Sequence, residues 1–413
     1  MIRKTGLCLI PLLILAAWTT LAGLAHHAPA FSAAEALAAP GQPAAATDTR
    51  TGHDSPRDPA AAAGKVWRVA YIEGGPYTDY QQILAGTVRG LARLGIIPDG
   101  NVPVPQNSES TREMWQWLAD HASGGRLQFI ADGYYSADWN PDRRTANRDA
   151  LLKRLREKGD VDMVFAFGTW AGLDMANDQH KVPTFSMSVT DAVGAGIVKS
   201  VQDSGFDHVH AQLEPGRYER QLAVFHDVFH FKRLGVPFDD RPEGRASIAM
   251  PVIEKSAREL GFTIVPCPTR LDVPDLDLAF DNLRQCVETL STTSDAIYLT
   301  TNTGMQGKRM VELLQPVIRA GIPTFSQSGP EETKLGVLLS LAQASFDDVG
   351  MFEAEAVSRV LSGAKPREVS QVFEGPLGLA INLRMAMLIG WNPPFEILAA
   401  VDEIHQQIRN AEQ

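Results

Sequence analysis

The sequence predicts an α/β protein built from two doubly wound parallel-sheet lobes, joined by a hinge and arranged as a clamshell. Short apolar strands alternate with helical segments twice along the chain, an order that favours parallel sheets. Residues 181–186 (K-V-P-T-F-S) and 321–326 (G-I-P-T-F-S) share a pattern at the start of each lobe's fourth strand. Polar residues follow several of the strands, where open α/β sheets bind ligands.

Length and composition restrict the class of protein. A chain of 413 residues has room for two or three domains. Its hydrophobic content of 44% and charged content of 21% are those of an ordinary globular protein. The formal charge of −11 argues against nucleic acid as a partner, because such binding normally depends on a basic surface.

The N-terminal 64 residues have the composition of an export signal followed by a linker. Arg3 and Lys4 precede an apolar run, Leu7 to Leu24, and an A-x-A site at 28–30, so residues 1–30 are interpreted as a cleaved signal peptide. The alternative is an uncleaved membrane anchor. Residues 31–64 are rich in Ala, Pro and Gly and are expected to be a disordered linker. The protein is therefore expected in the periplasm.

The first lobe begins with a strand at 66–72, followed by a Gly-Gly turn at 74–75 and a helix that ends near Gly95. This turn lacks the full G-x-G-x-x-G pattern, so no nucleotide cofactor is expected. We expect further helices at 114–121 and 146–158 and further strands at 127–130, 163–167 and 182–189. Polar or glycine residues at the ends of the last two strands indicate a ligand cleft: Gly168, Thr169, Ser188, Thr190 and Asp191.

The second lobe repeats this alternation. Strands are expected at 233–236, 262–265, 296–300 and from Pro323, and helices at 218–229, 246–260, 278–290 and 309–320. We assign residues 65–205 and about 336–366 to the N-terminal lobe, and residues 206–335 and about 367–413 to the C-terminal lobe. Cys267 follows a strand and Cys286 lies on the next helix. In an oxidising compartment they form either a disulfide or two buried thiols.

Several segments resemble a known family: 162–169 (D-M-V-F-A-F-G-T), 182–198 (V-P-T-F-S-M-S-V-T-D-A-V-G-A-G-I-V), 295–303 (D-A-I-Y-L-T-T-N-T), 363–366 (G-A-K-P) and 381–386 (I-N-L-R-M-A). From about residue 66 to 409 the chain resembles the type I periplasmic binding proteins that deliver solutes to ABC importers. The most similar group includes binders of tryptophan and tyrosine. The resemblance implies a monomeric solute-binding protein that is not an enzyme, needs no cofactor and has ABC permease subunits in the inner membrane as partners.

The resemblance also implies that strand-end residues hold a small-molecule solute between the lobes. Carried over by position, these residues are Gly75, Tyr77, Gly168, Thr169, Ser188 and Thr190 in the first lobe, and Thr301, Asn302, Ser326 and Ser328 in the second. The chain departs from the family pattern at 207–212 (D-H-V-H-A-Q) and at Trp170. Because both departures could alter the pocket, the ligand is not inherited from the family.

An amino acid-like solute is the expected ligand. Its carboxylate would need hydroxyls and backbone N–H groups, such as those at 168–169 and 326–328. Its ammonium would need a carboxylate, for which Asp191 and Glu73 are candidates. The aromatic residues either stack on the solute or pack within their own lobes: Tyr77, Tyr80, Trp170 and Phe325.

Two other functions have to be weighed. A binding protein of the same fold could present its ligand to a membrane sensor kinase, and the clamshell sequence would look alike. His226 and His230 have the i, i+4 spacing of a zinc helix, although Asp227 stands where the metalloprotease motif has Glu, and the helix is rich in phenylalanine. The sequence contains no G-x-S-x-G or P-loop motif, so no motif supports a hydrolase or ATPase function.

Overall fold

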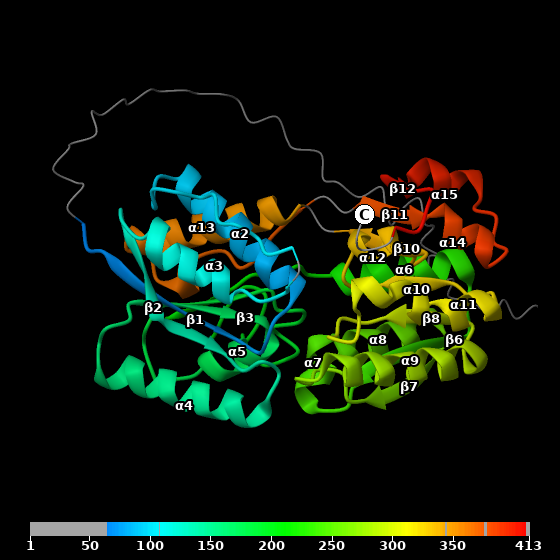
Figure 1. The fold of residues 1–413 in the computed structure, drawn as a ribbon, viewed down its shortest axis with the longest axis horizontal. Coiled ribbons are helices and arrows are strands. Elements are labelled where there is room, and N and C mark those ends of the chain that lie inside the picture. Colours follow the sequence, from blue (N-terminus) through cyan, green and yellow to red (C-terminus); the bar gives the residue numbers. More distant parts are fainter. Residues whose placement is uncertain (1–63, 107, 343–344, 376–377, 410–413) are drawn as a thin grey trace, which may run out of the picture.

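The computed structural model describes residues 64–106, 108–342, 345–375 and 378–409, which form two lobes, each around its own sheet (Figure 1). The expected signal peptide and almost all of the linker lie outside these residues. Within the described ranges, none of the helices is long and apolar enough to cross a membrane.

The first sheet is parallel throughout and has the strand order β2-β1-β3-β4-β5. Its strands are β1 (Trp67–Glu73), β2 (Leu127–Ser136), β3 (Met163–Phe167), β4 (Thr184–Met187) and β5 (Val209–Ala211). Alternate side chains of β1 and β3 point to opposite faces and enter two separate apolar cores. Helices α2 (Thr78–Arg93), α3 (Arg112–Trp117) and α13 (Phe346–Leu361) cover one face, and α4 (Pro141–Glu157) and α5 (Gly168–Met175) cover the other (Figure 1).

The second sheet has the order β12-β11-β10-β9-β8-β6-β7 and is parallel except where β10 meets β11. Its strands are β6 (Arg233–Asp239), β7 (Thr263–Thr269), β8 (Ala296–Leu299), β9 (Thr324–Ser326), β10 (Leu339–Ala342), β11 (Gly378–Asn382) and β12 (Glu403–His405). Its helices are α6 (Arg217–Phe229), α7 (Pro242–Ser247), α8 (Met250–Leu260), α9 (Leu276–Thr293), α10 (Met310–Leu313), α11 (Gln315–Ala320), α12 (Pro330–Lys334), α14 (Leu383–Leu388) and α15 (Phe395–Ala400). The two doubly wound lobes predicted from the sequence are therefore present.

The structure divides the chain between the lobes differently from the sequence-based boundaries. β5 pairs with β4 and extends the first sheet beyond residue 205. The segment 336–366, which the sequence assigned to the first lobe, contributes to both lobes: β10 pairs with β9 in the second sheet, while α13 packs on α2 in the first. The chain thus returns to the first lobe after β10, because the apolar face of α13 fits α2.

Helices α2 and α13 cross at very short range. A Cβ atom added to Gly350 would lie 2.1 Å from the carbonyl carbon of Gly86, and one added to Gly86 would lie 2.3 Å from the backbone oxygen of Phe346. Because these neighbours are backbone atoms, they cannot move aside as a flexible side chain can. The two glycines therefore set the distance between the helices.

We expect Gly350→Ala to force α13 away from α2 and to lower the free energy of unfolding by about 1–3 kcal/mol. Glu355→Ala, on the exposed side of the same helix, should change it by less than about 0.5 kcal/mol. Urea unfolding of both variants measures the difference. Equal stability of the two variants would contradict the close crossing.

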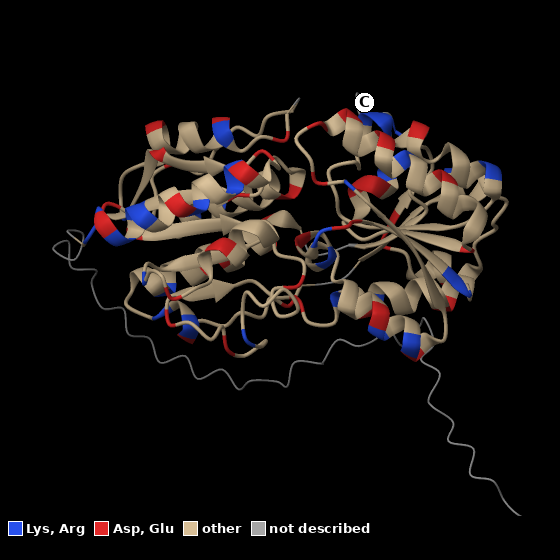
Figure 2. Cartoon of the chain, turned by 90° about the horizontal axis from the view of Figure 1, so that it is seen from below, with Lys and Arg blue, Asp and Glu red and all other residues tan. Residues whose placement is uncertain are grey.

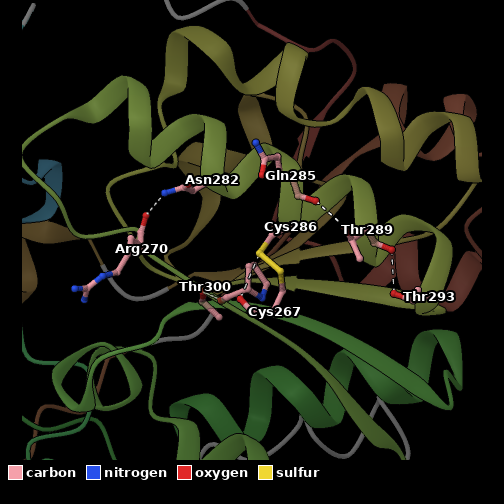
Figure 3. Close-up of a disulfide and its surroundings, with 9 residues drawn as sticks. Cys267, Arg270, Asn282, Gln285, Cys286, Thr289, Thr293 and Thr300 are labelled. Carbon is pink, nitrogen blue, oxygen red and sulfur yellow. Dashed lines mark hydrogen bonds between the residues drawn. A yellow bond between two sulfur atoms is a disulfide. The ribbon is translucent and has the colours of Figure 1, made fainter.

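Cys267 and Cys286 form a disulfide that ties edge strand β7 to helix α9 (Figure 3). Their Cα atoms are 5.8 Å apart, and 19 positions separate them in the sequence. Cys286 is buried and Cys267 is half-buried. Of the two alternatives left open by the sequence, the structure contains the disulfide.

Reduction should destabilise the second lobe by about 3 kcal/mol, because a cross-link closing a loop of this size restricts the unfolded chain. Urea unfolding with and without dithiothreitol tests this expectation. The double variant Cys267→Ala/Cys286→Ala is the control, since its unfolding midpoint should not respond to the reductant. A wild-type midpoint that is equally unresponsive would show that the bond is absent or adds no stability.

Candidate functional site

A cleft between the lobes collects residues that follow the carboxyl ends of strands in both sheets. β1 leads to Tyr77, β3 to Thr169 and β4 to Ser188, while β8 leads to Thr301 and β9 to Gln327. Other residues that line the cleft are Asp79, Tyr80, Ile83, Trp139, Trp170, Val189, Thr190, Gln212, Glu214, Arg217, Tyr218, Ser247, Asp272, Asn302, Thr303 and Ser328. The strand ends thus meet as expected for parallel α/β sheets.

Seven of the ten residues expected to bind ligand line this cleft: Tyr77, Thr169, Ser188, Thr190, Thr301, Asn302 and Ser328. Gly75, Gly168 and Ser326 do not. A Cβ at Gly75 would lie 2.6 Å from the indole of Trp139, and one at Gly168, where φ is +80°, would lie 1.7 Å from the hydroxyl of Tyr80. These glycines therefore make room for aromatic rings that line the cleft.

Ser326 makes local hydrogen bonds and does not line the cleft. Its hydroxyl donates to Glu332 over 3.3 Å and accepts from the backbone N–H of Gly329 over 3.2 Å. The side chain therefore fixes the turn that begins α12.

The structure places both carboxylates proposed for an ammonium group away from the cleft lining. Glu73 accepts hydrogen bonds from the hydroxyls of Tyr71, Thr111 and Tyr134 at 2.6, 2.7 and 2.9 Å. Burial raises its pKa, and these hydroxyls oppose the rise. Asp191 accepts from the backbone N–H of Gly194 at 2.7 Å. Both carboxylates thus serve local structure, and sequence position alone could not reveal these partners.

Four charged residues line the cleft that the sequence reasoning did not assign to it: Asp79, Glu214, Arg217 and Asp272. Asp79 lies in the first turn of α2, whose N-cap residue Tyr77 makes no side-chain capping hydrogen bond. Burial raises its pKa to about 6, although Arg217 opposes the rise. Figure 2 shows charged residues of both signs where the lobes meet. The cleft can therefore recognise charged as well as polar groups.

Arg217 begins α6 and extends into the cleft. One terminal nitrogen of its guanidinium lies 3.5 Å from Glu214, and the other donates to the carbonyl of Ser328 over 3.1 Å. Its Nε is buried and has no protein acceptor among the described residues. A solute carboxylate is a suitable acceptor for such a group.

Two tryptophans of the first lobe form part of the cleft wall. The ring centroids of Trp139 and Trp170 are 5.5 Å apart, with an edge-to-face arrangement. The indole N–H of Trp139 donates to the carbonyl of Pro76, which fixes that ring over the turn after β1. Phe325, the fourth stacking candidate, is fully buried in the core of the second lobe, whereas Tyr77, Tyr80 and Trp170 line the cleft.

The lobes contact each other beside the cleft. The hydroxyls of Tyr77 and Ser328 are 3.4 Å apart. Arg144 of α4 binds Asp174 within its own lobe and reaches Glu243 of the second lobe, each at 2.9 Å. Arg241 of the second lobe lies 5.0 Å from the ring centroid of Trp170. These contacts join the two lobes directly beside the cleft.

The histidines considered for zinc pack among aromatic rings. The His226 ring stacks on Phe262 at 5.7 Å and meets Phe231 edge-to-face at 5.0 Å, while the centroids of His226 and His230 are 6.3 Å apart. In the described part of the chain, no group of three or more His, Cys, Asp or Glu residues is arranged to hold a metal ion. The packing explains the phenylalanines that alternate with these histidines.

Comparison with known proteins gives a family and a fold. The family model described as "ABC transporter substrate binding protein" matches residues 136–404. No curated protein sequence matches the chain. A conserved domain protein from Vibrio cholerae is 20% identical, with a TM-score of 0.62 over 82% of this chain and 100% of the other.

Two further solved structures share the fold. An ABC domain from Streptococcus pneumoniae in complex with L-Trp is 16% identical, with a TM-score of 0.61 over 82% of this chain and 100% of the other. A substrate-binding protein from Clostridium difficile is 14% identical, with a TM-score of 0.54 over 83% and 100%. With a family match over more than half of its length and a cleft between two doubly wound lobes, the chain belongs to the ABC transporter substrate-binding proteins.

Proposed function

We propose that this protein captures an amino acid-like solute between its lobes in the periplasm and delivers it to the permease subunits of an ABC importer. The observation that carries the proposal is the composition of the cleft, which combines acidic groups, a guanidinium, hydroxyls and aromatic rings from both lobes. An amino acid presents an anionic group, a cationic group and a side chain in one small molecule. The pattern of residues 1–30, interpreted as a signal peptide, supports the periplasmic location.

The cleft offers a separate type of partner for each part of such a solute. The guanidinium of Arg217 and the hydroxyls of Thr169, Ser188 and Thr301 suit a carboxylate. Trp139 and Trp170 suit an apolar or aromatic side chain. The S. pneumoniae relative holds L-Trp, and its fold is shared with this chain. Aromatic amino acids are therefore the first solutes to test.

Capture depends on closure of the two lobes. A solute that contacts both lobes binds more tightly to the closed state than to the open one, and so it shifts the population toward closure. The permease can then recognise the closed form. The same coupling means that contacts between the lobes influence solute affinity even when they do not touch the solute.

Thermal-shift and calorimetric titration of residues 65–413 against amino acids, sugars and nucleosides tests the ligand class. An amino acid should raise the melting temperature, because it binds only the folded protein. Thr169→Ala should weaken its binding about 2- to 10-fold through the loss of one hydrogen bond. Thr145→Ala, on the exposed side of α4, is the control and should bind as the wild type does. Binding confined to sugars or nucleosides would contradict the proposal.

The ion pair between Arg144 and Glu243 should contribute to closure. Both side chains are partly exposed, so we expect Glu243→Gln to weaken solute binding by only about 2- to 5-fold, with faster dissociation. Stopped-flow fluorescence measures this rate. Glu254→Gln breaks a pair with Arg245 that lies wholly within the second lobe, and it should leave the rate unchanged. If both variants released solute at the wild-type rate, the interlobe pair would have no part in closure.

A further inference from the structure

We propose that Asp272 is the residue that binds the positively charged group of the solute, so that the cleft selects solutes carrying an ammonium group. This inference rests on the proposed function and deepens it. Asp272 follows β7, and no ligand contact was expected there from the sequence. Its position, its burial and the distribution of its hydrogen bonds carry the argument.

Asp272 is only 5% exposed, yet it lines the cleft. Its carboxylate has one hydrogen bond among the described residues, a long one of 3.4 Å from the backbone N–H of Thr303. Its backbone is well bonded: the N–H donates to Asp239 over 3.1 Å, and the carbonyl accepts from Arg241. The loop is therefore held firmly while the carboxylate is left almost without partners. A buried charge in this condition is unfavourable unless another group compensates it.

The guanidinium of Arg241 forms an ion pair with Asp239, the aspartate next to Asp272 in the structure. Arg241 contacts the carboxylate of Asp239 through Nε at 2.7 Å and through Nη2 at 3.0 Å. Asp239 also accepts the backbone N–H groups of Leu271 and Asp272. Arg241 reaches Asp272 only at its carbonyl. The protein thus neutralises Asp239 but supplies no ion pair to the carboxylate of Asp272 within the described residues.

The other two acidic residues of the cleft are better compensated. Glu214 accepts a hydrogen bond from Gln212 at 2.7 Å and lies 3.5 Å from the guanidinium of Arg217. Asp79 has no hydrogen bond or ion pair through its carboxylate among the described residues, but it is only half-buried, so water can solvate its charge. Asp272 is therefore the acidic group of the cleft that most needs a cation from the solute.

A cationic partner explains this arrangement better than a hydroxyl does. A sugar hydroxyl would donate a hydrogen bond but bring no charge to a carboxylate that already faces the charge of Asp239. An ammonium group supplies both a charge and up to three donors. Tyr80 of the first lobe and Asp272 of the second lobe line the same cleft, so a solute held at Asp272 can also face the first lobe.

Protonation of Asp272 should oppose solute binding. Burial raises the pKa of Asp272 to about 7; the charge of Asp239 adds to the rise, while Arg241 and the N–H of Thr303 oppose it. The ammonium requires the charged carboxylate, so affinity should fall about 10-fold for each unit of pH below 7. In the free protein the sign is opposite: the raised pKa means that stability from this group is greatest at low pH and is lost as the pH rises from about 4 through 7.

The test compares wild type and Asp272→Asn by calorimetric titration with three probes: L-tryptophan, tryptamine and indole-3-propionate, which lacks the ammonium. L-Tyrosine and L-leucine with their desamino acids form parallel sets. We expect Asp272→Asn to weaken binding of ammonium-bearing probes on the order of 10- to 100-fold. It should leave desamino probes unaffected and remove the pH dependence. Asp240→Asn is the matched control, because Asp240 is an exposed aspartate in the loop after β6.

A stability measurement separates binding from folding. Without solute at pH 8, Asp272→Asn should melt no lower than the wild type, because it removes an uncompensated buried charge. If Asp272 were needed only for structure, the substitution would lower the melting temperature instead.

The remaining outcomes discriminate between the two proposals. Wild-type affinity for amino acids in Asp272→Asn, or equal binding of amino and desamino probes by the wild type, overturns this inference and leaves amino acid capture standing. Binding of D-ribose or D-glucose that Asp272→Asn abolishes also overturns it, because the carboxylate would then accept hydroxyl donors. If no amine-bearing solute in the full set of amino acids binds the wild type, the proposed function falls and this inference falls with it.

Discussion

The structure depends on one geometric constraint: the carboxyl ends of parallel strands in two sheets face a common cleft. Backbone and side-chain polar groups accumulate at such ends because the strands stop there and the chain turns into helices. In a single lobe, water satisfies these groups. When the lobes close, each group must find a partner on its own lobe, on the other lobe or on a solute. The charged and hydroxyl groups of the cleft can therefore be sorted by which of these partners they have.

The hydrogen-bond partners distinguish cleft residues that stabilise the protein from those whose polar groups can bind a solute. Asn302 lines the cleft, but its side chain donates to the carbonyl of Thr300 and accepts from the N–H of Gly304, so it also builds the turn after β8. Gln327 likewise bonds the backbone of Thr301 and Ile248. Among the described residues, the side chain of Asp272 has a single hydrogen bond, from the backbone N–H of Thr303. The difference lies in the hydrogen-bond inventory of each residue, and it does not follow from residue type or from position at a strand end.

The sequence predicted the parts of the fold that local patterns determine. The buried run at Met163–Phe167 and the repeated P-T-F-S segments gave β3, β4 and β9 at nearly the right residues. The exchange of segments between the lobes depends instead on contacts distant in sequence. β10 pairs with β9, but the helix after it crosses to α2, where Gly86 and Gly350 permit close approach. The hydrophobic periodicity within 336–366 does not show that the strand and the helix belong to different lobes.

The same limit applies to the cleft. Residues directly after strands, such as Thr169 and Thr301, could be assigned from the sequence because topology alone places them. Trp139 could not, since it reaches the cleft only by packing over Gly75, and its backbone adopts a left-handed conformation with φ of +57°. Arg217 and Asp79 lie at the starts of helices, and their role depends on how the lobes meet.

Arg241 connects the chemistry of the cleft to closure of the lobes. Its guanidinium holds the carboxylate of Asp239 and the carbonyl of Asp272, and it also lies over the ring of Trp170 in the other lobe. Arg144 lies 4.9 Å from the same ring and reaches Glu243 across the interface. The ring of Trp170 thus contacts cations from both lobes. The guanidinium of Arg241 therefore holds the loop that carries Asp272 and also contacts Trp170 in the other lobe. A solute that neutralises Asp272 would bind to a loop that is already linked to the contact between the lobes.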